Sequence, residues 1–240
     1  MSEIKLLLID SKNRLSHSPS STNAFFQFNE LNATSVEVVS FQMPMTSYNI
    51  NSTNNIVYFF DTVLRNFTIT VGNYSVYDFI AELQSKFNSS SLGGYTVTYS
   101  DVSMKLTISK ATTFQLLFGT YTTNSSAYIM GFNNTNTSVA LSQLSNNCIN
   151  LSLPLYICCD ITELGISCKT TDNTSTVFVF PNKVNVADIL SYSENTDYKM
   201  CARISDRGLR NMQIRFSTSN NIDLDINNAD WMMILRLCYC

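Results

Sequence analysis

Charged residues, glycine and histidine are all scarce in this chain, and each shortage excludes a class of function. Asp, Glu, Lys and Arg make up 14% of the 240 residues, and the formal net charge is −3. Such a balance does not imply a strongly acidic or strongly basic partner. The 7 glycines include no G-x-G or G-K sequence, so we expect no glycine-rich phosphate-binding loop.

The single histidine and the cysteines form no catalytic or metal-binding pattern. His17 is far in sequence from every cysteine, which leaves a Cys–His or Ser–His pair without a base. None of the 7 cysteines belongs to a C-x-x-C pair with a matching second half. We therefore predict reduced thiols that act as small apolar residues, no metal site, no cofactor and no enzymatic activity.

Acidic residues cluster only at Asp223 and Asp225, with Asp230 beyond them. Their spacing could place two carboxylates on one face of a strand, as glycoside hydrolysis or Ca²⁺ binding requires. The alternation with Leu224 and Ile226 instead favours an ordinary solvent-exposed face.

Long apolar runs are also missing. Near the start the longest run is Leu6 to Ile9, far short of the ~20 residues of a membrane span or the ~7–15 of a signal-peptide core. We expect synthesis in the cytosol and no membrane span. The chain instead has 45% hydrophobic residues, mostly in short alternating runs.

One stretch, from Phe67 to Phe87, changes from a strand pattern into a helix pattern. Ser75 and Asp78 form a capping box, which predicts a helix over 75–88. Its apolar stripe consists of Val76, Phe79, Ile80, Leu83 and Phe87. Ala127 to Phe132 has the pattern either of a short second helix, near 125–130, or of one helical turn followed by a kink.

The rest of the chain has the patterns of strands and loops. Val36 to Met45 is the longest apolar strand, and a slip in its phase indicates a bulge near Val38 or burial on both faces. Ile149 to Ile157 alternates strictly, whereas 133–147 is rich in Asn, Thr and Ser and predicts a long exposed loop. In the last strand the inward positions are Trp231, Met233, Leu235, Leu237 and Tyr239. About a dozen strands with one or two helices favour an all-β sandwich.

The first residues combine a strand pattern, Ile4 to Ile9, with a polar stretch that has no apolar periodicity. So short a strand is not stable alone. It adds to its own sheet, adds to a neighbouring subunit, or stays disordered until assembly, and we expect the last. The predicted division is an N-terminal arm, 1–22, and a single domain with loop insertions, 23–240.

Segments along most of the chain also carry a resemblance. They are GNYSVYDFIAELQSKFN, the strand pair of 95–108, IMGF at 129–132, DSKNR at 10–14, the strand of 26–28, MPMTSYNIN and NIDLDINNADW. Together they resemble the penton and minor capsid proteins of virophages, polinton-like viruses and nucleocytoplasmic large DNA viruses. The resemblance implies a single jelly-roll β-sandwich in the virion, a homo-pentamer at the five-fold vertex and contacts with the major capsid protein.

Two groups of residues are candidate contacts in such an assembly: Ile4, Leu6 and Leu8 in the arm, and Arg203, Arg207 and Arg210 in a basic span that also includes Lys199 and Arg215. The basic span could contact phosphates or an acidic neighbour, or do neither. No aromatic platform is interleaved with it, so we expect no specific nucleic-acid binding. The alternative function is a lectin-like or receptor-binding β-sandwich module on a virion or fibre, with Tyr48, Tyr121 and Tyr128 as candidate platforms.

Overall fold

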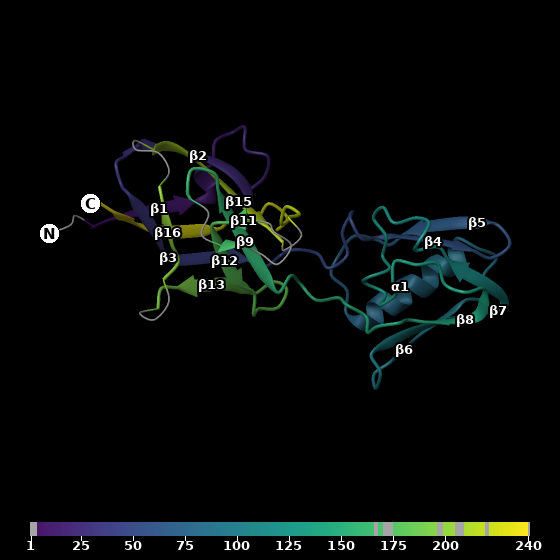
Figure 1. The fold of residues 1–240 in the computed structure, drawn as a ribbon. Coiled ribbons are helices and arrows are strands. Elements are labelled where there is room, and N and C mark those ends of the chain that lie inside the picture. The colour runs from purple at the N-terminus through teal and green to yellow at the C-terminus, as the bar shows by residue number, and fades with distance from the viewer. Residues whose placement is uncertain are drawn as a thin grey trace. The chain divides into compact units, whose positions relative to one another are not determined.

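The chain forms two compact units in the computed structural model (Figure 1), which describes residues 4–165, 168–169, 175–195, 199–204, 209–218 and 221–239. Unit 1 consists of Met1–Ser47 and Leu153–Cys240, and unit 2 consists of Tyr48–Ser152. One insertion in the chain therefore has a core of its own.

Unit 1 contains two antiparallel sheets that face each other across one core. The first sheet has the order β1 (Ile4–Asp10), β16 (Met232–Cys238), β3 (Ser35–Pro44) and β13 (Ile189–Ser193), and the short β14 (Cys201–Arg203) also pairs with β3. The second sheet has the order β12 (Phe178–Pro181), β9 (Tyr156–Ile161), β15 (Leu209–Ser217) and β2 (Asn23–Leu31). A separate ribbon pairs β10 (Cys168–Lys169) with β11 (Ser175–Thr176).

The strand order of unit 1 is that of a jelly roll. Unit 1 has eight main strands when its short strands β10, β11 and β14 are left out. Numbered along the chain, these strands have the order 1-8-3-6 in the first sheet and 5-4-7-2 in the second. Two Greek keys folded into facing sheets give this order. The predicted jelly-roll fold is confirmed.

The core of unit 1 follows the predicted alternation. Trp231 and Leu237 are each 2% exposed, and Met233 and Leu235 are fully buried. The Trp231 ring meets the ring of Phe216 edge-on, with centroids 4.9 Å apart. In β3 the pairing with β16 shifts from Ser40 to Val38 between consecutive partners, which confirms the bulge.

The N-terminal residues belong to the sheet of unit 1. β1 pairs with β16 from Ile4 opposite Cys238 to Asp10 opposite Met232, and Ile9 is buried. The polar stretch that follows is also held in place, because the hydroxyl of Ser11 donates to Asp230 at 2.9 Å. The prediction of an arm that stays disordered is therefore wrong for residues 4–22. The partners of β1 and Ser11 lie more than 200 positions away, where local sequence patterns give no sign of them.

Unit 2 combines one helix with five strands (Figure 1). The strand order is β5 (Leu64–Thr68), β4 (Ile56–Phe60), β7 (Lys105–Leu116) and β6 (Thr96–Ser100), and β8 (Ala140–Leu144) also pairs with β7. Helix α1 (Val76–Ser89) begins at the predicted cap, where the Ser75 hydroxyl accepts from the Asp78 N–H at 3.2 Å. Its stripe of Phe79, Leu83 and Phe87 is fully buried in the core. No helix in the described part of the chain is long and apolar enough to cross a membrane.

One local prediction for unit 2 is confirmed, and two for unit 2 and its boundary are wrong. Residues 127–131 form the predicted single turn with a kink, with a φ of +76° at Gly131, rather than a second α-helix. The predicted loop at 133–147 contains β8. Ile149 to Ile157 is not one strand, because the chain passes from unit 2 to unit 1 between Ser152 and Leu153, and β9 begins only at Tyr156.

Candidate assembly surface

The face of the first sheet that points away from the core carries exposed apolar side chains. Leu6 and Leu8 of β1 are 63% and 59% exposed, and Ile189 of β13 is 60% exposed. Half-buried apolar side chains lie beside them on the same face, from Met232, Ile234 and Pro44. Leu8 lies opposite Ile234, and Ile189 lies opposite Pro44. We call this surface the outer face.

The alternation of side chains along β1 and β16 produces the outer face. Ile9, Met233 and Leu235 point into the core, so the residues between them point outward. β16 has the sequence MMILRLC and is apolar on both parities, except for Arg236. Strands with this composition are usually covered on both sides. An uncovered apolar surface of this kind is typical of an interaction site.

Four charged side chains at one end of the outer face neutralise one another. Arg236 donates to Glu37 and to Glu194, each at 2.7 Å, and Lys199 Nζ lies 3.4 Å from Glu194. The hydrogen bond with Arg236 lowers the pKa of Glu194 and raises that of the guanidinium. Glu194 and Arg236 are therefore charged at neutral pH. Two positive charges balance two negative ones, so the cluster offers no net charge to a phosphate backbone.

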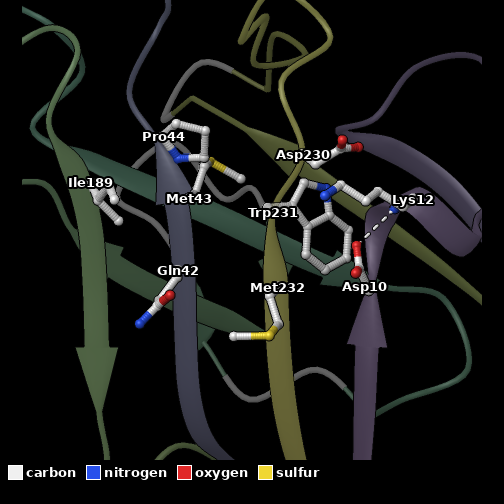
Figure 2. A pocket seen from close by; sticks show the side chains of 9 residues that line it. All are labelled: Asp10, Lys12, Gln42, Met43, Pro44, Ile189, Asp230, Trp231 and Met232. Carbon is white, nitrogen blue, oxygen red and sulfur yellow. Dashed lines mark hydrogen bonds between the residues drawn. The ribbon is translucent and has the colours of Figure 1, made fainter.

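A shallow pocket of about 330 Å³ lies at the other end, where β13, β3, β16 and β1 meet (Figure 2). Ile189, Pro44 and Met232 form its apolar part, and the carboxylates of Asp10 and Asp230 lie on the side of β1.

Both carboxylates bind their own chain. Asp10 accepts from the Lys12 N–H at 2.9 Å, and Asp230 accepts from the Ser11 hydroxyl and from Arg14 at 3.3 Å. The pocket lining includes no histidine, cysteine, serine or threonine.

The structure separates the two predicted groups of contacts. Leu6 and Leu8 lie on the outer face, and Ile4 begins the same strand opposite Cys238. Arg203 is exposed on β14 of the first sheet, whereas Arg210 is exposed on β15 of the second sheet. Arg207 lies outside the described residues. The roles of these residues in assembly stay predictions.

The basic span is not one continuous surface. Lys199 belongs to the neutral cluster described above, and Arg215 pairs with Asp223. The second carboxylate of the acidic pair, Asp225, accepts from the Asn227 N–H at 2.7 Å. No group of three or more His, Cys, Asp or Glu side chains in the described residues could hold a metal ion.

The remaining sequence candidates have ordinary environments. His17 is exposed, and its ring centroid lies 5.1 Å from that of Phe25. Cys158 and Cys159 are buried, as small apolar residues would be. Cys148 and Cys201 are exposed, which the sequence prediction did not anticipate.

Sequence reasoning missed Ile189, Met232 and Ile234 as surface residues. The two β16 residues could have been found, because a strand that is apolar on both parities requires cover on both faces. Ile189 could not, because its place depends on the pairing of β13 with Pro44 at the distant end of β3.

Comparisons with known proteins add a likeness of fold. No family model matches the sequence, and no curated protein matches it. Among solved structures, the chain is similar to the mavirus penton protein, with 7% sequence identity and a TM-score of 0.47. The alignment covers 98% of this chain and 99% of that protein.

Proposed function

We propose that this chain is a structural capsid protein of a double-stranded DNA virus, which forms a homo-pentamer at the five-fold vertex and contacts the major capsid protein. The observation that carries the proposal is the jelly roll with an uncovered apolar outer face. Jelly rolls are frequent in viral capsid proteins and in lectins. The resemblance of the sequence to penton proteins favours the capsid.

The contrast between the two sheets supports an assembly role for the outer face. On the solvent side of the second sheet, the Gln213 amide donates to Asn23 at 2.9 Å, and Arg215 lies 3.6 Å from Asp160. Polar groups paired in this way are stable in contact with water. The first sheet instead exposes Leu6, Leu8 and Ile189, which gain free energy when a neighbour covers them.

A ring of five copies requires two different surfaces on each subunit. In a heterologous interface one patch contacts a different patch of the next copy, and the ring closes when the rotation allows it. We assign the outer face to one side of this interface. With only 14% charged residues, the surface also allows copies to approach without strong repulsion.

The proposal is tested by the mass of the full chain in native mass spectrometry, alone and after coexpression with the major capsid protein. Five copies of the 27.0 kDa chain give about 135 kDa. The double variant Leu6→Asp and Leu8→Asp should remain folded, because both side chains are exposed, but should lose the pentamer.

The matched control is Leu92→Asp, which changes a 95% exposed leucine of unit 2 and should leave the pentamer intact. A pentamer that tolerates both β1 substitutions would show that the outer face is not the interface. A chain that is monomeric under all conditions and absent from purified particles would refute the capsid role.

A further inference from the structure

Tyr128 is the one exposed residue in an otherwise buried segment of unit 2. Its side chain is 70% exposed, whereas Ala127 and Met130 are fully buried and Ile129 is 7% exposed. Every other residue of 126–132 is buried as well. The buried residues on either side keep the aromatic ring of Tyr128 in water. Contact with another apolar surface would therefore be favourable for this ring.

The surroundings of Tyr128 are held in a fixed arrangement. The Asn147 N–H donates to the Gly131 carbonyl at 2.8 Å, and the Asn150 N–H donates to the Ile129 carbonyl at 2.9 Å. A Cβ atom at Gly131 would lie 2.4 Å from the carbonyl oxygen of Asn147, so the two segments are in tight contact. The turn that carries Tyr128 and the segment after β8 therefore form one preorganised surface.

A pocket of about 640 Å³ opens beside Tyr128, between these two segments. Its volume lies within the range of about 300–1,000 Å³ typical of small-molecule sites. Phe132 supplies a buried apolar base, and Lys105 and three asparagines, Asn146, Asn147 and Asn150, supply polar groups.

The asparagines keep hydrogen-bonding groups for a ligand. Asn146 accepts from the Asn133 N–H through Oδ1, and Asn147 donates to Asn133 through Nδ2, both at 3.2 Å. Asn150 accepts from Ser152 through Oδ1. Within the described residues, Nδ2 of Asn146 and Asn150 and Oδ1 of Asn147 have no partner. Because at least one bond orients each amide, the open groups have defined directions.

We propose that this pocket binds a carbohydrate. The C–H face of a pyranose ring packs on the ring of Tyr128, and its hydroxyls bond to the open amide groups of Asn146, Asn147 and Asn150. Sugars suit this lining because they combine an apolar ring face with hydroxyls that both donate and accept.

Lys105 determines the preference among sugars. It is the only charged side chain in the lining and forms no ion pair with a described residue. A carboxylated sugar is therefore expected to bind more tightly than its neutral counterpart. The site lies wholly in unit 2, so the inference does not rest on the capsid role of unit 1.

The other two candidate tyrosines lack such a setting. Tyr121 is already stacked on Tyr58, with ring centroids 4.2 Å apart. Tyr48 is 40% exposed and lines neither of the two pockets described.

The test applies the full chain to a glycan array and then measures the affinity for bound sugars by saturation-transfer NMR. Tyr128→Ala should weaken binding by about tenfold or more, and Tyr128→Phe, which keeps the ring, should remain within about threefold of the unchanged chain. Lys105→Met should weaken the binding of a carboxylated sugar more than that of the matched neutral sugar.

Tyr77→Ala is the matched control, because Tyr77 is 62% exposed in the same unit and does not line the pocket. This variant should bind as the unchanged chain does. The inference is overturned if no glycan binds on the array or at millimolar concentration in solution. Binding that survives Tyr128→Ala, or that Tyr77→Ala reduces equally, also overturns it. Pentamer mass is measured separately, so a failed sugar site leaves the capsid proposal standing.

Discussion

Lys110 Nζ lies 2.7 Å from Asp61 Oδ2 in unit 2, and the two side chains are only 11% and 2% exposed. Asp61 also accepts from Arg65 at 2.8 Å, and the Lys110 ammonium lies 4.5 Å from the centroid of the Tyr95 ring. Because Asp61 follows β4 and Lys110 lies in β7, the cluster links two strands. A buried ion pair adds little net stability, but the loss of one partner leaves a charge in the interior.

We expect Asp61→Asn to lower the free energy of unfolding by about 3–5 kcal/mol, because two cations would then face one neutral amide. Glu82→Gln is the control, since Glu82 lies 3.6 Å from the half-exposed Lys86 and glutamine keeps the oxygen that accepts from Thr70. The control should change stability by less than about 1 kcal/mol. Urea unfolding followed by circular dichroism measures both variants. Equal losses would contradict the assigned role of the cluster.

The same cluster predicts sensitivity to acid. Burial raises the pKa of Asp61, but the hydrogen bonds and positive charges of Lys110 and Arg65 together lower it by more. The pKa of Asp61 therefore lies below its ordinary value. A depressed pKa gives stability that is complete above the unfolded value of about 3.9 and is lost as the pH falls through the folded value. Melting temperature should therefore fall more steeply below about pH 4 in the unchanged chain than in Asp61→Asn. Parallel curves would show that Asp61 has no depressed pKa.

β1 provides a matched pair of substitutions in adjacent residues. Ile9 is 2% exposed, so Ile9→Ala should cost about 2–5 kcal/mol as a buried truncation. Leu8→Ala changes an exposed side chain and should alter monomer stability by less than about 0.5 kcal/mol. Fluorescence of Trp231, the only tryptophan, reports the unfolding of unit 1. If Ile9→Ala melts as the unchanged chain does, β1 does not belong to this sheet.

Two glycines with a positive φ allow the cost of backbone strain to be measured apart from the cost of a steric clash. Gly94 has φ of +81°, and a Cβ atom added there would meet open space, whereas Gly131 has φ of +76° and an added Cβ atom would lie 2.4 Å from a carbonyl oxygen. Gly94→Ala should cost about 1–2 kcal/mol from backbone strain alone. Gly131→Ala should cost clearly more, because the turn must also move away from Asn147. Similar melting temperatures for the two variants would contradict the close contact at Gly131.

Periodicity predicted those elements whose partners or signals are local. The cap at Ser75, the buried stripe of α1 and the bulge in β3 all depend on residues within a few positions. Periodicity failed where distant residues decide the structure. The Thr22 hydroxyl donates to the Leu224 carbonyl, and no local pattern announces such a bond. The strand order was expected from the resemblance alone, because alternation does not specify which strands are neighbours.

The candidate sites show the same division. Leu6 and Leu8 could be named as candidate contacts because they stand out in a short apolar run, and both are exposed. The proposed site at Tyr128 could be anticipated only in part. Its ring was a candidate platform, but the exposure of one residue in a buried turn and the approach of Asn147 depend on tertiary packing.

The pairing of β1 with β16 also determines how long β1 remains without its partner strand during synthesis. Asp10 lies opposite Met232, so 222 positions separate the two and β1 is made well before its partner strand. At roughly 5–20 residues per second, β1 waits about 11–44 s for β16. Unit 2 is continuous in sequence and is complete at Ser152, well within that interval. Throughout the wait, the edges of β1 are unpaired, and they are a place where neighbouring nascent chains can join before the sheet closes.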